Sequence, residues 1–338
     1  MCGIAGYITS NDNRASETII SSMVESIHHR GPDSNGIFCF ENIALGHARL
    51  AIIDLSESAA QPMHCEDKNF TIVYNGELYN YLEIKKKLTN LGYRFYSTSD
   101  TEVILNAYKE WGSKCVKMFN GMFAFAILNK QKRELFFARD RYGIKPLYHC
   151  YTSEGLIFSS EIKAIEKNPL YRFNINLNGI REYFTFQNFY SNQTLNQGIE
   201  MFPAGHYGSV KLDSVSPIKL TQYWDFSFEE PEIKLEKEEI SEELSRLFQQ
   251  AVTRQLVSDV ELGSYLSGGM DSGSITAVAS RKISQMHTFT CGFDMSGALT
   301  LKSGLMKPIK LENFLVSLEP IITKKLLALQ KWNLLYQQ

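Results

Sequence analysis

The sequence predicts a mixed α and β domain over about the first two hundred residues, followed by the opening of a parallel α/β sheet. Short runs of β-branched and aromatic residues alternate with stretches of helical periodicity up to about residue 212. Beyond residue 235 the pattern changes to helix, strand, glycine-rich turn, helix and strand, which is how a parallel sheet begins. The length of 338 residues leaves room for two domains of about 150 residues each.

Runs of β-branched and aromatic residues predict the strands of the first domain. They are residues 37–40, 70–74, 123–128, 134–138 and 156–158. The predicted helices between them are residues 15–27, 78–91 and 101–111. The last two helices end at Gly92 and Gly112, a usual helix stop. The polar stretch 128–133 predicts a hairpin turn, so we expect most strands to pair antiparallel.

The boundary between the two patterns lies near residues 213–235. Residues 213–217 are turn-like, and residues 226–232 form an acidic stretch with a proline. The elements predicted after it are a helix at 237–257, a strand at 260–266, a helix at 272–284 and a strand at 288–291. The predicted division is a domain at 1–212, a linker at 213–235, the start of a second domain at 236–297 and a tail at 298–338.

The composition is that of an ordinary globular protein, with 44 % apolar and 21 % charged residues. The formal net charge is −2, so we expect neither a nucleic-acid partner nor an anionic membrane partner. No run of 18 apolar residues predicts a membrane span, and the N-terminus does not resemble a signal peptide. The six cysteines show no C-x-x-C spacing, which favours a reduced, cytoplasmic protein over a zinc or redox site.

Cys2 is the first candidate for chemistry. A small second residue permits removal of Met1, which would leave Cys2 with a free α-amine. An N-terminal cysteine carries a nucleophile and its own base in one residue, because an α-amine has an unperturbed pKa of about 7.7–8.0. A cysteine at position 2 is a weak signal by itself, since most such residues are incidental.

Two further features of the first domain fit that chemistry. Asn75 and Gly76 follow a predicted strand and can offer a side-chain amide and an approachable backbone N–H, the two donors of an oxyanion hole. Arg49 suits an α-carboxylate and Asp100 an α-ammonium, so together they can hold a free amino acid. Asn-Gly is also a common turn dipeptide, and the spacing does not show whether these residues converge.

The second domain contains the sequence L-S-G-G-M-D-S at residues 266–272. A Ser-Gly-Gly turn between a strand and a helix exposes successive backbone N–H groups beside a helix N-terminus, a combination that binds phosphate. No lysine follows, so a P-loop that transfers a γ-phosphate fits poorly. The competing interpretation is a simple glycine turn in which Asp271 and Ser272 cap the helix.

These motifs resemble those of the glutamine-hydrolysing asparagine synthetases. The matching segments are M-C-G-I-A-G at 1–6, H-R-G-P-D at 29–33, N-G-E-L-Y-N at 75–80, R-D-R-Y-G-I-K-P-L-Y at 139–148, F-P-A-G-H at 202–206 and S-G-G-M-D-S at 267–272. The resemblance runs from residue 1 to about residue 297. It implies a class II glutamine amidotransferase domain with the N-terminal-nucleophile hydrolase fold, an αββα sandwich. A partial α/β ATP-pyrophosphatase domain of Rossmann-like topology would follow.

The resemblance also implies roles for individual residues. Cys2 is the implied nucleophile, and Asn75 with Gly76 forms the implied oxyanion hole. The implied glutamine-binding residues are Arg49, Leu50, Ala51, Ile52, Ile53, Asn75, Gly76, Glu77 and Asp100. The implied ATP-binding residues are Leu266, Ser267, Gly268, Gly269, Asp271, Ser272 and Cys291. His28 and His29 are interpreted as structural, because the α-amine already supplies a base, and no metal ligands are identified.

The reaction that the resemblance implies has two halves. Cys2 attacks the carboxamide of glutamine, which releases ammonia and leaves a γ-glutamyl thioester that water cleaves to glutamate. ATP, with Mg²⁺ expected on its pyrophosphate, adenylates aspartate, and the ammonia converts the adenylate to asparagine and AMP. The implied partners are therefore glutamine, aspartate and ATP, and a homodimer is a candidate assembly.

The resemblance breaks after residue 297. Residues 299–338 are rich in Leu and Lys, which favours an amphipathic helical tail. A second hypothesis is a frameshift, because codons allowed for residues 298–333 can, with suitable third bases, encode segments similar to the family's next stretch when read in another frame. We expect a chain whose second domain is incomplete to hydrolyse glutamine but not to make asparagine by itself. Two alternatives stay open: an amidotransferase of the same architecture acting on another carboxylate, such as a sugar acid in surface-polysaccharide synthesis, and a non-catalytic remnant.

Overall fold

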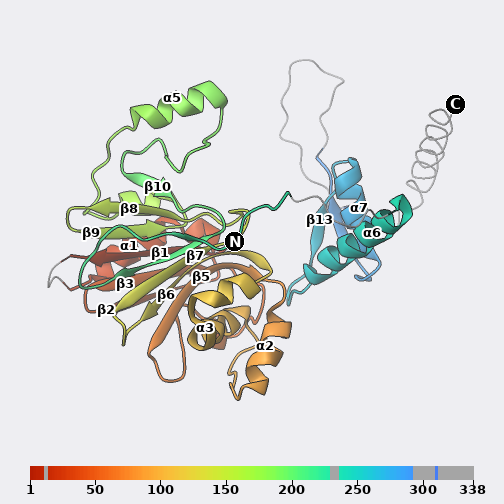
Figure 1. Ribbon diagram of the computed structural model, residues 1–338, viewed down its shortest axis with the longest axis horizontal. Helices are drawn as coiled ribbons and strands as arrows, with labels where there is room; N and C mark the ends of the chain where they lie inside the picture. Colours follow the sequence, from red (N-terminus) through yellow and green to blue (C-terminus); the bar gives the residue numbers. More distant parts are fainter. Residues whose placement is uncertain (11–13, 229–235, 292–308, 311–338) are drawn as a thin grey trace. The chain divides into compact units, whose positions relative to one another are not determined.

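The computed structural model describes residues 1–10, 14–228, 236–291 and 309–310. The chain divides into two compact units, residues 1–230 and 231–338. The described part of the first unit contains two six-stranded sheets (Figure 1), and that of the second contains a three-stranded sheet with two helices.

The first sheet is antiparallel throughout, with β1 among its central strands. Its order is β10 (Ile199–Met201), β8 (Tyr148–Thr152), β9 (Gly155–Ser159), β1 (Gly3–Thr9), β3 (Ile43–Arg49) and β2 (Ser34–Phe40). The register of β1 and β3 sets Gly3 opposite Ala48. This pairing places Cys2, which directly precedes β1, beside the end of β3.

The second sheet is also antiparallel, and one of its strands, β5, is paired along only part of one edge. Its order is β12 (Thr221–Gln222), β11 (His206–Lys211), β7 (Glu134–Arg139), β6 (Gly121–Asn129), β5 (Phe70–Leu78) and β4 (Met63–His64). The hairpin predicted at 128–133 joins β6 to β7 and is confirmed. Since β4 pairs only with Thr71 and Ile72, the later half of β5 has an open edge.

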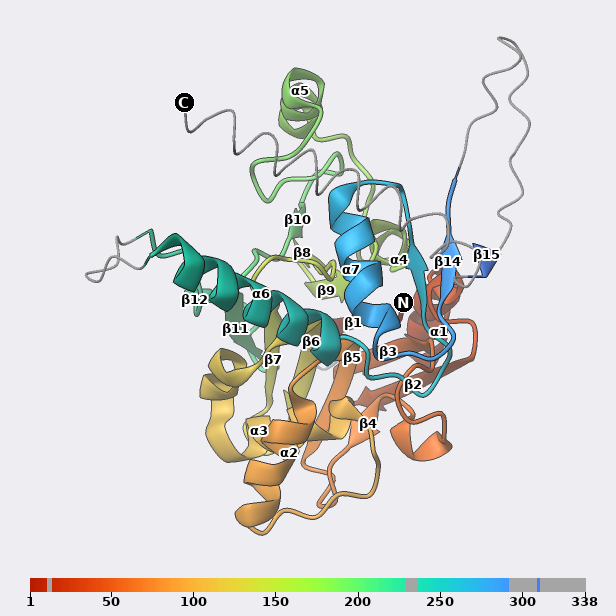
Figure 2. The same ribbon diagram turned by 90° about the vertical axis from the view of Figure 1, so that its right-hand side faces the viewer.

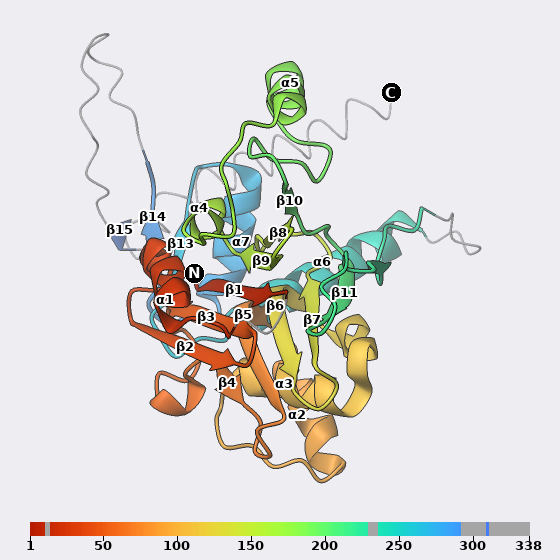
Figure 3. The same ribbon diagram turned by 90° about the vertical axis from the view of Figure 1, so that its left-hand side faces the viewer.

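The core lies between the two sheets, and the strand period of two sorts side chains onto opposite faces. Ile4 and Ile8 of β1 pack between the sheets, whereas Ala5 and Tyr7 face α1 (Glu17–Ser26) and α4 (Ile162–Glu166). On the far side, α3 (Asp100–Trp111) packs against β5, and α2 (Tyr81–Asn90) packs against α3 (Figure 3). The order helix, sheet, sheet, helix confirms the predicted αββα sandwich.

The sequence does not predict β1 or β3, and close packing explains why. Glycines interrupt the β-branched pattern of both strands. A Cβ on Gly6 would collide with Phe158, and one on Gly46 would collide with Val24 of α1. Other described elements of the first unit that were not predicted are β4, β8, β10, β11, β12, α4, α5 (Leu177–Phe186) and the short 3-10 helices His28–Arg30, Glu57–Ala59 and Gly112–Met118.

The second unit begins with α6 (Lys237–Arg254) and continues through β13 (Gly263–Tyr265), α7 (Met270–Ser280) and β14 (His287–Phe289). β13 and β14 pair in parallel, as predicted, and β15 (Ile309–Lys310) pairs antiparallel with β14. Val252 of α6, Ala279 of α7 and Met286, which directly precedes β14, form a small core. Figure 2 shows these three elements.

Two expectations cannot be compared with this structure. The helical tail and the frameshift both concern residues 298–338, which, apart from β15, lie outside the described residues. No helix in the described ranges is long and apolar enough to cross a membrane.

Phe137 provides a test of the core between the sheets. Its ring centroid lies 5.0 Å from that of Phe158, and its side chain is buried. We expect Phe137→Ala to lower the free energy of unfolding by about 3–5 kcal/mol, because the substitution leaves a cavity between two sheets. The measurement is urea denaturation. The exposed Leu82→Ala is the control, expected within about 0.5 kcal/mol of wild type; equal effects of both substitutions would contradict this core assignment.

Candidate active site

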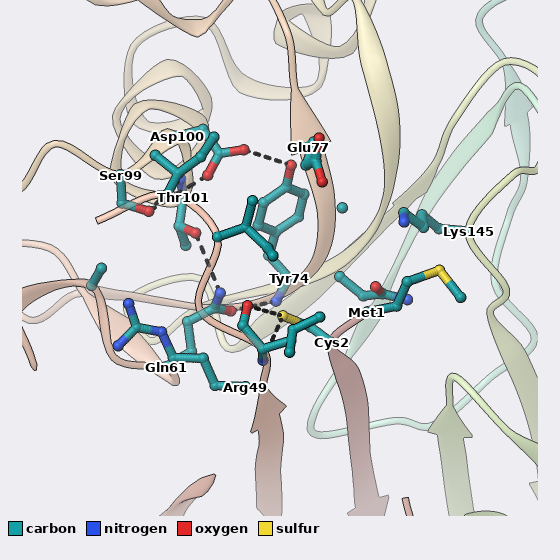
Figure 4. A pocket seen from close by; sticks show the side chains of 16 residues that line it. Met1, Cys2, Arg49, Gln61, Tyr74, Glu77, Ser99, Asp100, Thr101 and Lys145 are labelled. Carbon is teal, nitrogen blue, oxygen red and sulfur yellow. Dashed lines mark hydrogen bonds between the residues drawn. The ribbon is translucent and has the colours of Figure 1, made fainter. Parts of the chain in front are cut away.

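A pocket of about 260 Å³ lies in the first unit, where Cys2, the end of β3 and the open edge of β5 meet (Figure 4). The structure brings together most of the first-domain residues singled out in the sequence. Those that line the pocket are Cys2, Arg49, Leu50, Ile52, Ile53, Asn75, Gly76, Glu77 and Asp100. Ala51 is not among the lining residues, and its backbone N–H donates to the Asp33 carboxylate at 2.8 Å. His28 and His29 do not line the pocket either.

Cys2 is held at the pocket by Leu50, which directly follows β3, and by Arg30 of the first 3-10 helix. Its Sγ lies 3.4 Å from the backbone nitrogen of Leu50, which donates to it, and 3.5 Å from the carbonyl oxygen of Leu50. Arg30 Nε donates to the carbonyl oxygen of Cys2 at 2.9 Å. Burial raises the pKa of the Cys2 thiol, and the hydrogen bond from Leu50 opposes that rise. The N-terminal amine of this chain belongs to Met1, and burial lowers its pKa, which favours the neutral form.

The open edge of β5 presents one free backbone donor to the pocket. Backbone N–H groups two residues apart on a strand point to the same edge. The N–H of Tyr74 donates to Gln61 Oε1 at 2.7 Å, and the N–H of Leu78 donates to Asp100 Oδ2 at 2.9 Å. Gly76 lies between them, and no described residue accepts a hydrogen bond from its N–H. A ligand in the pocket can therefore receive that hydrogen bond.

The side chain of Asn75 is the second free donor. It is 0 % exposed, it lines the pocket, and neither Nδ2 nor Oδ1 has a hydrogen-bond partner in the described structure. An unpartnered buried amide costs stability unless something satisfies it. Gly76 adds a steric condition, because a Cβ there would collide with the carbonyl oxygen of Met122. The adjacent Asn75 amide and Gly76 N–H therefore suit an oxyanion that forms in the pocket.

Asp100 lies at the first turn of α3 with one carboxylate oxygen already engaged. Oδ2 accepts hydrogen bonds from Tyr74 Oη and from the Leu78 N–H, both at 2.9 Å. Burial raises the pKa of this carboxyl, and those two hydrogen bonds oppose the rise. Its position at a helix N-terminus also favours the anion. Oδ1 has a long 3.5 Å contact with Ser99 Oγ, and the backbone N–H groups of Thr101 and Asp100 also lower the pKa of the carboxyl. Because Asp100 lines the pocket, its carboxylate can face a cation that binds there.

Arg49 and Glu77 are the other charged residues that the sequence predicts at this site. Arg49 Nη1 donates to the carbonyl oxygen of Ser56 at 2.9 Å, and Nη2 donates to that of Asp54. These two bonds fix the guanidinium at the pocket wall and leave further N–H groups for a ligand. Burial raises the pKa of the Glu77 carboxyl, and the positive charge of Lys145 opposes that rise.

The pocket also contains residues to which sequence reasoning gave no role. They are Met1, Ala59, Gln61, Tyr74, Ser99, Thr101 and Lys145. Gln61 connects two walls of the pocket, because its amide accepts from the Tyr74 N–H and its Nε2 donates to Thr101 Oγ1 at 3.3 Å. One sequence feature could have drawn attention to Lys145. The charged pair Arg139-Asp140 follows an apolar run a few residues before it, and charged residues that are buried in such a place are usually paired and support the nearby chain.

The residues expected to bind ATP lie at one edge of the sheet in the second unit. β13 and β14 run parallel, so the turn after β13 and residues 290–291 after β14 meet at their carboxyl ends, where α/β sheets bind ligands. The hydroxyl of Thr290 donates to the Leu266 carbonyl at 2.7 Å. Gly268 has a φ of +81°, which favours glycine. In the described structure the backbone N–H groups of residues 268–272 have no acceptor, and Cys291 is exposed at the same edge.

Two family models match the chain. The glutamine amidotransferase domain model matches residues 1–224, and the asparagine synthase model matches residues 243–302.

Curated relatives extend the similarity over most of the chain. Glutamine-hydrolyzing asparagine synthetase 3 of Bacillus subtilis (strain 168) is 35 % identical over 303 residues, covering 87 % of this chain and 48 % of the relative. Glutamine-hydrolyzing asparagine synthetase 1 of the same organism is 34 % identical over 302 residues, covering 88 % and 46 %. The chain therefore spans about half the length of these curated relatives.

His47 supplies a pH-dependent test of the strand that supports the site. It is wholly buried in β3, with Nε2 3.0 Å from the Tyr74 carbonyl oxygen, and burial lowers its pKa to about 4. The folded pKa lies below the unfolded value of about 6.5. The contribution of neutral His47 to the free energy of unfolding is therefore complete above pH ~6.5 and is lost as the pH falls through about 4. We expect unfolding titrations to show a loss on the order of 3 kcal/mol from this group.

The matched variants for this prediction are His47→Gln and His28→Gln. His47→Gln should flatten the fall in stability between pH ~6.5 and ~4, whereas the exposed His28→Gln should not change it. An unchanged slope in His47→Gln would contradict the assignment.

Proposed function

The chain belongs to the glutamine amidotransferase family, and from this premise we propose that its first unit hydrolyses glutamine with Cys2 as the nucleophile. The observation that carries the proposal is the adjacent pair of free donors, the Asn75 amide and the Gly76 N–H, in a pocket shared with the Cys2 thiol. Such donors stabilise a tetrahedral oxyanion, and no described residue competes for them.

The proposed acylation begins after Met1 is removed. The freed α-amine of Cys2 accepts the thiol proton, and Sγ bonds to the carboxamide carbon of glutamine while the Asn75 and Gly76 donors bind the oxyanion. Collapse of that intermediate breaks the C–N bond, and the proton held by the α-amine passes to the departing nitrogen, giving ammonia. Water then cleaves the γ-glutamyl thioester, which releases glutamate and restores the thiol.

The charged residues of the pocket suit the two ends of a free amino acid. Glu77 and the carboxylate of Asp100 fit the α-ammonium group, and Arg49 fits the α-carboxylate. Tyr74 and the Leu78 N–H keep Asp100 in place for this contact. We propose that Leu50, Ala51, Ile52 and Ile53 shape the same site through the chain that follows β3.

For the second unit we propose ATP binding in a synthetase that transfers the ammonia to aspartate. The acceptor-free N–H groups of residues 268–272 and the N-terminus of α7 fit a pyrophosphate group. Leu266, Ser267, Gly268, Gly269, Asp271, Ser272 and Cys291 would hold the nucleotide. Mg²⁺ would arrive with the phosphates, to which it adds positive charge, and Asp271 offers the oxygen ligand type that it prefers. No group of three or more candidate ligands is arranged for a metal in the described ranges.

We keep the domain division at 1–212, 213–235 and 236–297 as part of this proposal. The described part of the second unit contains α6, α7 and three short strands. Formation of asparagine by the complete synthetase, from aspartate, ATP and the released ammonia, is likewise proposed from the synthetase relatives.

Asn75→Ala tests the glutaminase half. We expect kcat for glutamine hydrolysis to fall about 10²–10³-fold, because one oxyanion donor is lost. The unfolding free energy should change little, because the Asn75 amide has no protein partner to lose. The measurement is glutamate release by the purified chain. Cys2→Ala defines the inactive baseline, and Cys39→Ala, a thiol that does not line the pocket, serves as the matched control. Full activity in Cys2→Ala would refute the proposal.

Gly268→Val tests the nucleotide site. A β-branched residue cannot readily adopt the positive φ of this turn, so we expect MgATP binding to weaken about tenfold or more. Gly112→Val is the matched control, because Gly112 also has a positive φ in open space but lies in the first unit. Calorimetric titration with MgATP measures both variants. Absence of binding to wild type, or equal losses in the two variants, would contradict the assignment.

A further inference from the structure

Lys145 carries a buried ammonium group that the proposed reaction does not use. Its side chain is 3 % exposed and lines the pocket with Cys2 and Glu77. Figure 4 places it on the side of Met1 and Glu77, away from Ser99. Across the described residues, Nζ has no hydrogen bond or ion pair to a protein atom. An unpaired ammonium in such a place is costly, so the fold must hold it there.

The backbone around Lys145 is fixed by two buried charged side chains. The carboxylate of Asp140 accepts hydrogen bonds from four backbone N–H groups. They belong to Phe123, Tyr142, Ile144 and Lys145, at 3.1, 3.1, 2.9 and 3.0 Å. Arg139 donates to the carbonyl oxygens of Lys145 at 2.7 Å and Gly143 at 2.6 Å. Lys145 is therefore held in place by a preorganised loop, unlike a surface lysine that folds inward by chance.

Charged groups from several elements face Cys2 and the chain terminus. Arg30 approaches from the first 3-10 helix, Glu77 from β5, Asp100 from α3, and Lys145 from the loop after β7. Arg30 is already engaged with the Cys2 carbonyl oxygen and with Glu161. Lys145 is thus the cation of this set without a protein partner. Asp140 also faces Lys145, but its carboxylate is engaged by the loop.

The positive charge of Lys145 lowers the pKa of three neighbouring groups: the N-terminal amine, the Cys2 thiol and the Glu77 carboxyl. The N-terminal amine of the uncleaved chain belongs to Met1, and burial lowers its pKa; Lys145 lowers that pKa further, whereas Cys2 and Glu77 raise it. The α-amine that removal of Met1 would expose on Cys2 lies in the same pocket as Lys145, so the positive charge acts on its pKa in the same direction. Burial raises the pKa of the Cys2 thiol and of Glu77, and Lys145 opposes both rises. A positive charge here therefore favours a neutral amine, a thiolate and an ionised Glu77.

We propose that Lys145 is a positioning residue of the glutaminase reaction. Fixed beside Cys2 and Glu77, its positive charge keeps the α-amine of Cys2 free to accept the thiol proton and keeps Glu77 ionised for the α-ammonium of glutamine. This inference rests on the proposed function of Cys2 as an N-terminal nucleophile.

The test compares the pH dependence of glutamine hydrolysis in full-length Lys145→Met, Lys145→Gln and Lys145→Arg, with Met1 removal checked by mass spectrometry. Without the cation the pKa of the amine rises, so the amine stays protonated to higher pH. We expect the acidic limb of kcat/KM to move up by about one pH unit in the Met and Gln variants, a loss of about tenfold below that limb. Lys145→Arg should restore the limb, and the exposed Lys132→Met should leave it unchanged.

A purely structural role gives a different result, because it lowers the rate equally at every pH. An acidic limb that stays in place in both neutral variants, or that Lys145→Arg does not restore, overturns the inference. An acidic limb that does not move still leaves the proposed function intact, provided that wild type is active and Cys2→Ala is not. A wild-type chain without glutaminase activity overturns both. The rate at which iodoacetamide alkylates Cys2, measured against pH, reports the same electrostatic shift without turnover.

Discussion

The antiparallel pairing of β1 with β3 is the constraint on which the candidate site depends. It sets Gly3 opposite Ala48, so Cys2 lies against the Leu50 peptide at the end of β3. Gly6 leaves room for Phe158 of the neighbouring strand β9, and Gly46 leaves room for Val24 of α1, because a Cβ at either position would collide with that side chain. Cys2 is therefore positioned by sheet register, which is more precise than positioning by a loop.

The second sheet contributes by leaving one edge open. Because β4 is short, β5 turns unpaired backbone groups toward Cys2, and Gln61 and Asp100 satisfy two of them. The donors left without partners are those of Asn75 and Gly76. Buried polar groups are normally paired, so unpaired donors beside a thiol indicate where a ligand binds. The same contrast holds between Asp140, whose carboxylate is fully engaged, and Lys145, whose ammonium is free.

The sequence predicts those parts of the fold whose pattern is local. The hairpin between β6 and β7 and the strand–turn–helix order of residues 263–289 follow from periodicity and turn residues. β1 and β3 could not be predicted, because their glycines are required by close contacts with side chains that are distant in sequence. Cys2, Asn75 and Gly76 were proposed from their chemistry and from a family resemblance. That they line the same pocket could not be predicted from the sequence. Gln61 and Lys145 could not be assigned, since their roles depend on hydrogen bonds to Tyr74 and on a loop organised by Asp140.

The central claim is that Cys2 becomes the N-terminal residue and bonds covalently to the glutamyl group of glutamine. The most direct measurement is mass spectrometry of the N-terminal peptide from a chain quenched in acid during turnover of glutamine. We predict a peptide that begins at Cys2, lacks Met1 and carries one glutamyl group. A peptide that retains Met1 in an active enzyme, or a glutamyl group on any other residue, would contradict it.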